Sequence, residues 1–130
     1  PGKPYLPQAL SHGTLECDEK EASERFYRNV LGLEIAGGGR LSLNIKHPST
    51  PWYIVVLPGR KRTDLSPSSR FTLTLASREA VEEAHREFTA SGHTVGVTEV
   101  RAIQKQGQEV SFLSSDLDRN WWELSVPVVP

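Results

Sequence analysis

The sequence predicts an α+β fold in which one βαβββ unit is used twice. A short alternating strand that opens at His12 is followed by a helix-like run, and the same pattern begins again at Arg70, 58 residues later. The offset holds inside the helices, where Phe26 corresponds to Ala84. A repeated unit of this size cannot bury a core alone. We therefore expect two curled mixed sheets around a central cleft, with the helices outside.

The composition fits a single globular domain that spans residues 1–130. Hydrophobic residues make up 37% of the chain and charged residues 24%, which is typical of globular proteins. The first repeat is expected over about 9–57 and the second over about 70–127, with a loop at 58–69 between them. The Pro-rich first ten residues are expected to form an extended arm.

In the first repeat, residues 11–17 alternate between apolar and polar positions, which predicts a half-buried strand. Asp18 is the predicted cap of the following helix, with Glu21 completing a capping box. Apolar residues then recur at helical spacing as far as Leu33, and Gly32 is the predicted stop. Two further strands are predicted at 40–46 and 52–57. The remaining strand of this repeat is not apparent from the pattern.

The second repeat opens with a predicted strand at 70–75. Ser77 or a neighbour caps a helix that runs to about Ser91, and Gly92 ends it. Three strands are predicted after the helix, at 94–100, 109–114 and 121–126.

The alternation within the strands predicts which side chains face the cleft. Each helix should cover the apolar side of its sheet, so the polar side should face the other way. In the last strand, Trp121 and Glu123 belong to that second set, and pairing Trp121 with Trp52 gives Ile54 as the counterpart of Glu123. The full cleft-facing set is His12, Thr14, Glu16, Arg70, Thr72, Thr74, Trp121, Glu123 and Ser125, with Trp52, Ile54 and Val56 as first-repeat counterparts.

Charge and cysteine content exclude several classes of function. The net charge is −1 and the pI is about 6.5, so there is no electrostatic case for nucleic acid or an anionic membrane surface as a partner. Cys17 is the single cysteine, which excludes an intramolecular disulfide and a cysteine zinc site, and we expect a buried, inert thiol. No membrane-length apolar run and no signal peptide are visible, so a cytoplasmic location is expected.

Two stretches carry a resemblance to a known family. The segment LSHGTLECDEKEASERFYRNVLGLEI is similar to the opening of vicinal oxygen chelate proteins, and DLDRNWWEL resembles their DPDGN-x-x-E-L signature. The resemblance covers about residues 9–127. This superfamily includes glyoxalase I, extradiol dioxygenases, and bleomycin- and fosfomycin-resistance proteins. It implies the fold but not one reaction, because its members span several chemistries and pure binding proteins.

The resemblance also implies four equivalent positions for metal ligands, two in each repeat. Carried over to this chain, they are His12, Ile54, Arg70 and Glu123. Arg70 stands where the second repeat usually has His, and Ile54 stands where glyoxalase I-like members have Glu.

Arg70 argues against a metal at this position. An iron or manganese centre of this kind needs about three protein ligands, typically two His and a carboxylate. An arginine is always protonated and has no acceptor, and its charge repels a cation. Another donor, such as Glu16 or His47, would have to replace it. Arg70 has three other possible roles: an ion pair with Glu123, a contact to a ligand's carboxylate, phenolate or carbonyl, or extension into solvent.

The leading functional hypothesis is a metal-free binding protein, most simply a homodimer, that sequesters an aromatic natural product or antibiotic. Aromatic walls with a few polar groups suit a planar, mostly apolar ligand. The candidate ligand-binding residues are His12, Thr14, Trp52, Ile54, Arg70, Thr72, Phe112, Trp121 and Glu123. No catalytic residue is assigned.

Two enzymatic alternatives remain open. The resemblance implies a metal-dependent enzyme of the extradiol dioxygenase or glyoxalase-lyase type, in which His12 and Glu123 would hold Fe, Mn or Zn. A metal-free enzyme would instead use His12 as a general base and Glu123 as an acid.

Overall fold

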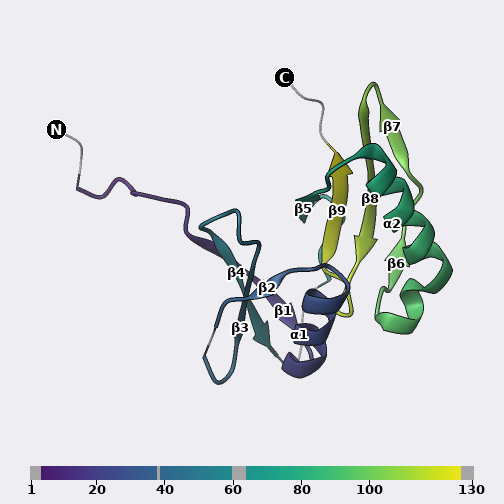
Figure 1. The fold of residues 1–130 in the computed structure, drawn as a ribbon. Helices are drawn as coiled ribbons and strands as arrows, with labels where there is room; N and C mark the ends of the chain where they lie inside the picture. Colours follow the sequence, from purple (N-terminus) through teal and green to yellow (C-terminus); the bar gives the residue numbers. More distant parts are fainter. Residues whose placement is uncertain (1–3, 38, 60–63, 127–130) are drawn as a thin grey trace. The chain divides into compact units, whose positions relative to one another are not determined.

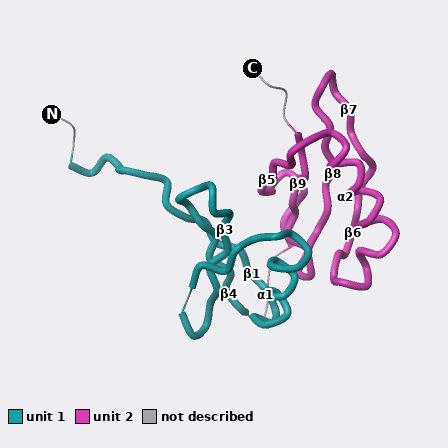
Figure 2. Tube along the Cα trace, in the orientation of Figure 1, with its two compact units in different colours: residues 1–60 teal, residues 61–130 magenta. Residues whose placement is uncertain are grey.

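The computed structural model describes residues 4–37, 39–59 and 64–126. The chain divides into two compact units, residues 1–60 and 61–130, which Figure 2 shows in different colours. The division falls in the predicted loop at 58–69. Of the predicted N-terminal arm, residues 4–10 contain no helix or strand, whereas residues 1–3 lie outside the described part. The end of the second repeat, residue 127, also lies outside it.

Unit 1 has the predicted βαβββ order and a four-stranded mixed sheet (Figure 1). The strand order is β1-β4-β3-β2, in which β1 and β4 are parallel and the other pairs are antiparallel. The strand that the sequence did not reveal is β2, which is only two residues long and too short to show alternation. The elements are β1 (His12–Cys17), α1 (Lys20–Asn29), β2 (Glu34–Ile35), β3 (Leu43–Lys46) and β4 (Tyr53–Pro58).

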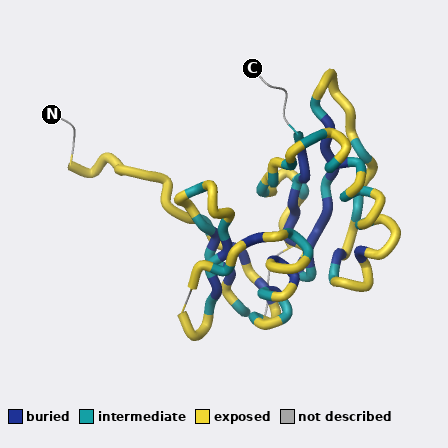
Figure 3. Tube along the Cα trace, viewed as in Figure 1, coloured by how far each residue is buried: buried dark blue, intermediate teal, exposed yellow. Residues whose placement is uncertain are grey.

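Along the longer strands of unit 1, buried residues alternate with exposed or half-buried ones (Figure 3). One face of the sheet is therefore apolar and buried, and the other carries the exposed residues of β1. Helix α1 packs on β2, β3 and β4 and buries Phe26 and Tyr27. The apolar spacing of the sequence thus predicted both the helix and the side of the sheet that it covers. The buried strand residues are Leu15, Cys17, Leu43, Ile45, Ile54 and Val56.

The start of α1 differs from the prediction by one residue. The cap residue is Glu19 rather than Asp18, and the Glu19 side chain makes no capping hydrogen bond. The helix therefore begins one residue later than the predicted cap position at Asp18 implies. Gly32, with φ 66°, follows the helix in the left-handed conformation that its prediction as a stop requires.

Unit 2 repeats this plan with a longer helix and a divided edge strand (Figure 1). The order is β5-β9-β8-β6, with β7 also pairing to β8; β5 and β9 are parallel and the other pairs are antiparallel. Ser77 caps α2 as predicted, because its side chain accepts the Ala80 N–H at 3.1 Å. The elements are β5 (Arg70–Thr74), α2 (Arg78–Ser91), the 3₁₀ helix η1 (Gly92–Val95), β6 (Glu99–Val100), β7 (Gln104–Gln106), β8 (Glu109–Ser115) and β9 (Trp121–Val126).

The predicted strand at 94–100 is wrong over its first half. Residues Gly92–Val95 form the 3₁₀ helix, and Gly96 then adopts φ 106°. The chain packs so closely here that a Cβ added at Gly92 would lie 3.0 Å from the Cβ of Val97. The strand therefore begins only at Glu99.

The register of the parallel strand pairs corrects the alignment of the two repeats. His12 lies opposite Tyr53, and Arg70 lies opposite Trp121. The counterpart of Trp121 is thus Tyr53, not Trp52, so the sequence alignment was wrong by one residue. A slip of one residue moves every side chain of a strand to the other face of its sheet.

A tight turn built around Asp116 joins β8 to β9. The Asp116 carboxylate accepts the backbone N–H of Asp118 at 2.9 Å and of Asn120 at 3.0 Å, and its other oxygen accepts Trp122 Nε1 at 3.1 Å. Arg119 has φ 63°, where the DPDGN signature of the resemblance has glycine. This turn sets the start of β9 and therefore the position of its side chains.

No helix in the described part of the chain is both long enough and apolar enough to span a bilayer.

Candidate functional site

The sheet of unit 2 has one face against α2 and one face away from it. Phe112 identifies the first face, because its ring makes edge contacts with Phe88 and His85 of α2 at centroid distances of 5.8 and 5.0 Å. Side chains alternate along a strand, and directly paired residues share a face. The opposite side, which we call the α2-distal face, therefore carries Arg70, Thr72, Thr74, Glu99, Ser111, Leu113, Ser115, Trp121, Glu123 and Ser125.

Glu123 is held on this face by two groups of the neighbouring strand β5. Its Oε1 accepts the hydroxyl of Thr72 at 2.8 Å and lies 3.5 Å from Arg70 Nε. The side chain of Glu123 is 16% exposed and that of Arg70 is 36% exposed. The ion pair between Arg70 and Glu123, one of the three roles open to Arg70, is therefore present. The hydroxyl and the guanidinium together satisfy a largely buried carboxylate.

The Arg70 guanidinium is also anchored from the preceding loop. Its Nη1 donates to the backbone oxygen of Pro67 at 3.1 Å. Because one nitrogen contacts Glu123 and another contacts the loop, the guanidinium is held at the edge of the α2-distal face rather than extended freely into solvent.

Trp121 lies on the predicted face but does not form a bare aromatic wall. The guanidinium of Arg101 sits over its ring at 4.7 Å from the ring centroid, and Trp121 is only 7% exposed. Arg101 Nε in turn contacts Glu99 Oε2 at 2.9 Å. Trp121 therefore has the Arg101–Glu99 ion pair above it and Arg70 beside it on β5.

Arg101 is the residue that sequence reasoning missed. It follows β6 directly, and its backbone N–H donates to Leu113 O at 2.9 Å, which continues the pairing of Glu99 with Ser115. The available signal was the spacing of Glu99 and Arg101, because residues at positions i and i+2 of a strand lie on the same face. The signal was lost because the predicted strand ended at residue 100.

Two predicted ligand-binding residues lie in the cores instead. Phe112 is 1% exposed and packs against α2. Ile54 is 4% exposed and pairs with Gly13 and Ile45, on the apolar side of the unit 1 sheet. The facing expected for Ile54 is wrong because of the one-residue slip in register, and Phe112 faces the helix because of its position in β8.

The corresponding face of unit 1 carries His12, Thr14 and Glu16, all exposed. The His12 ring stacks on Tyr53 at 5.0 Å with an interplanar angle of 8°, and its Nδ1 lies 2.9 Å from Ser11 Oγ. Tyr53 therefore occupies the aromatic position that was assigned to Trp52. Trp52 itself precedes β4 and is 42% exposed.

The donors on the α2-distal face do not fit a divalent metal. Among the strand residues of this face, Glu123 is the one largely buried carboxylate. Its Oε1 already contacts Arg70 and Thr72. Within the described residues, no group of three or more His, Cys, Asp or Glu side chains is placed to hold a metal ion. His47, considered as a replacement donor, has its Nδ1 2.7 Å from Ser49 Oγ in an exposed loop.

No family model matches the chain, and no curated protein matches its sequence. Solved structures do match it over nearly its full length. The fosfomycin resistance protein FosX from Listeria monocytogenes has a TM-score of 0.72 at 20% identity, covering 95% of this chain and 97% of that one. FosX from Mesorhizobium loti has a TM-score of 0.70 at 14% identity, covering 95% and 96%.

An enzyme shares the same fold. Lactoylglutathione lyase from Agrobacterium tumefaciens has a TM-score of 0.67 at 20% identity, covering 95% of this chain and 96% of that one. At these identities the similarity establishes the architecture and leaves the chemistry open. Together with the two βαβββ units, it confirms what the sequence resemblance implied: the chain has the fold of the vicinal oxygen chelate superfamily.

Proposed function

We propose that this chain is a small-molecule-binding protein that sequesters an aromatic natural product or antibiotic without a metal. The carrying observation is the contact between Arg70 and Glu123. At a position where the resemblance implies a histidine ligand, the chain places a permanent cation beside the carboxylate that would complete the site.

The electrostatic consequence favours an organic ligand over a metal ion. Two unit charges 4 Å apart interact by about 4 kcal/mol at an effective dielectric of 20, so Arg70 would strongly oppose a nearby divalent ion. A ligand with a carboxylate, phenolate or carbonyl oxygen would instead gain a hydrogen bond from the guanidinium. Thr72 and Glu123 add a hydroxyl and a carboxylate on the same face.

The similarity to fosfomycin resistance proteins supports a role in binding an antibiotic. In unit 2 the candidate ligand contacts are Arg70, Thr72, Trp121 and Glu123 on the α2-distal face. Unit 1, taken by itself, offers His12 and Thr14 on the exposed side of β1, and exposed Trp52 before β4. Ile54 and Phe112 are weaker candidates, because both are buried on the apolar sides of their sheets. A homodimer is part of the proposal, on the strength of the sequence resemblance, and so is the cytoplasmic location that the sequence predicted.

Metal analysis is the first test. The purified protein is offered Fe(II), Mn(II) or Zn(II), and the bound metal is measured in the wild type and in Glu123→Gln. We expect no stoichiometric tight binding. Stoichiometric metal that is lost in Glu123→Gln would overturn the proposal and favour a metal-dependent enzyme, for which the similarity to lactoylglutathione lyase is the supporting observation.

Ligand binding is the second test. A panel of aromatic antibiotics and natural products is titrated by calorimetry, with product analysis after incubation. We expect saturable binding of at least one compound class with no turnover. Turnover of a bound compound, or no binding across the whole panel, would contradict sequestration.

A further inference from the structure

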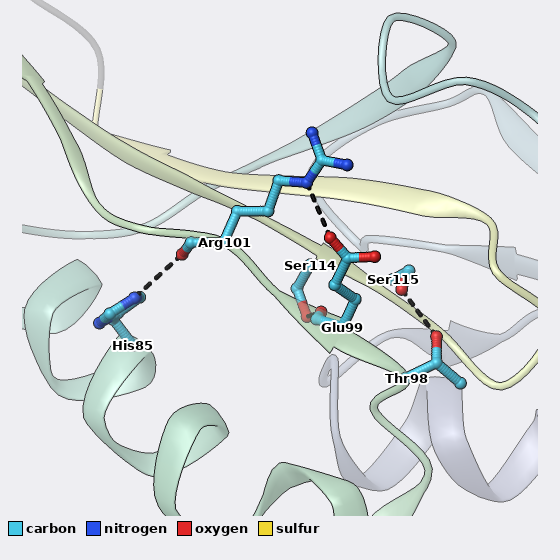
Figure 4. Close-up of polar contacts among 6 residues, drawn as sticks. All are labelled: His85, Thr98, Glu99, Arg101, Ser114 and Ser115. Carbon is cyan, nitrogen blue, oxygen red and sulfur yellow. Dashed lines mark hydrogen bonds and ion pairs between the residues drawn. The ribbon is translucent and has the colours of Figure 1, made fainter.

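Arg101 is fixed more thoroughly than an ordinary surface arginine (Figure 4). Its backbone N–H donates to Leu113 O at 2.9 Å, and its backbone oxygen accepts His85 Nε2 at 3.0 Å from helix α2. Its Nε contacts Glu99 at 2.9 Å, and its guanidinium lies over Trp121 at 4.7 Å. Four different elements of unit 2 therefore determine where the guanidinium sits.

The backbone just before Arg101, around the short strand β6, is also anchored by hydroxyl groups. Ser114 Oγ donates to the backbone oxygen of Glu99 at 2.9 Å, and Thr98 Oγ1 lies 2.7 Å from Ser115 Oγ. Figure 4 shows these residues around the short strand β6. The backbone of Glu99, whose carboxylate orients Arg101, is thus itself held in place by hydrogen bonds.

Stability alone gives little reason for this arrangement. The side chains of Arg101 and Glu99 are 49% and 50% exposed, and solvent screens ion pairs at that exposure so that they add little to stability. Ordering a long arginine side chain also costs rotamer entropy, which offsets part of that gain. The ion pair with Glu99 therefore adds little to folding stability, which leaves the fixed guanidinium available for recognition.

The unused donors of Arg101 indicate what it can recognise. Its Nε is taken by Glu99, whereas its Nη1 and Nη2 make no hydrogen bond to any described residue. These two nitrogens form the end of a planar fork that matches the two oxygens of a carboxylate. Because Trp121 and Glu99 hold the fork in place, less entropy is lost when it binds.

We propose that Arg101 recognises the carboxylate of an aromatic acid. This inference rests on the proposed function and names its ligand class. The carboxylate binds the terminal nitrogens of Arg101, whose side chain is 49% exposed. Arg70 lies on the other side of Trp121, where it offers a second cationic group to a further oxygen of the ligand. His85 is a positioning residue, because it holds the backbone of Arg101 without facing the ligand.

The test compares a carboxylate with its neutral isostere. The whole chain is titrated by calorimetry with 2-naphthoate and with 2-naphthamide, in the wild type, Arg101→Gln, Arg101→Lys and the control Arg86→Gln. Arg86 is also an exposed arginine paired to a glutamate, Glu83, but it lies on α2 away from the site. Loss of one charge-assisted hydrogen bond predicts a weakening of 2-naphthoate binding of roughly tenfold or more in Arg101→Gln.

The remaining measurements distinguish the role of Arg101 from the proposed function of ligand sequestration. Arg101→Lys should also weaken 2-naphthoate, because an ammonium cannot bind bidentately. 2-Naphthamide should bind the wild type more weakly than 2-naphthoate and should respond little to either Arg101 variant, and Arg86→Gln should match the wild type. Equal binding of both probes, or 2-naphthoate binding that is unchanged in Arg101→Gln, would overturn the role of Arg101 while leaving sequestration in place. If neither probe nor any compound of the aromatic panel binds, the proposed function fails as well.

Discussion

Arg70 and Glu123 lie on the neighbouring parallel strands β5 and β9, and Arg70 Nε is 3.5 Å from Glu123 Oε1. The pair is partly exposed, so it adds little to the free energy of unfolding. Its significance is chemical, because it commits one carboxylate oxygen to a protein cation. A site built in this way selects ligands that bring their own acceptor atoms.

Replacing the cation by an imidazole should change the metal preference of the α2-distal face. We expect Arg70→His to raise Zn(II) affinity at least about tenfold, because the repulsive charge disappears and a ligating nitrogen is added next to Glu123. Titration calorimetry with Zn(II) measures the change. Arg86→His, on α2, is the matched control and should show no gain. An unchanged Zn(II) affinity in Arg70→His would mean that the family's ligand position does not carry over to β5.

The turn at Arg119 should be open to stabilisation. Arg119 has φ 63°, a conformation that costs a residue with a Cβ about 1 kcal/mol relative to glycine. We expect Arg119→Gly to raise the free energy of unfolding by about 1 kcal/mol, measured by urea denaturation.

The same substitution removes the ion pair of Arg119 with Asp64, at 3.2 Å and with both side chains more than half exposed. Asp64→Ala removes that pair alone and should leave stability nearly unchanged. A stability loss in Arg119→Gly larger than that of Asp64→Ala would show that the backbone argument is wrong.

Asp116 should be the most sensitive residue of the same turn. It is 1% exposed and accepts hydrogen bonds from Asp118, Asn120 and the Trp122 indole. Asp116→Ala leaves these donors without their acceptor, at a cost of about 3 kcal/mol. Urea denaturation measures this cost, and exposed Asp64→Ala again provides the control. A loss no greater than that of the control would contradict the structural role of Asp116.

Substitutions at Phe112 test whether this residue serves the core or the proposed ligand site. Its ring packs between His85 and Phe88 of α2, so Phe112→Ala should cost about 3–5 kcal/mol. The milder Phe112→Leu should remain folded and bind 2-naphthoate like the wild type. A selective loss of binding in Phe112→Leu, with stability little changed, would return Phe112 to the ligand site.

The repeat predicted most of the architecture. The first strands and both helices follow the offset of 58 residues, since β1 begins at His12 and β5 at Arg70, and α1 begins at Lys20 and α2 at Arg78. Alternation within β1 and β5 also predicted which of their faces is apolar, because that pattern depends only on the chain itself.

The candidate site was predicted less completely, because it depends on pairing between strands. The two repeats have loops of different length, so only the observed register shows that Glu123 corresponds to Val55 rather than Ile54. Arg101 was missed for a related reason. It lies beyond the last residue of a two-residue strand, and its proposed role depends on contacts with Trp121 and Glu99, which no local pattern links to it.

The parallel pairing of first and last strands has a consequence for how the chain folds during synthesis. In unit 1, β1 cannot complete its pairing until β4 has been made, and in unit 2 β5 must wait in the same way for β9. Each closure joins segments some 40 to 50 residues apart, which slows folding because the entropy of loop closure is lost first. All strands of the first sheet are present once Pro58 has left the ribosome, so that sheet can assemble before the second has been translated. The duplicated plan thus divides one slow folding problem into two successive smaller ones.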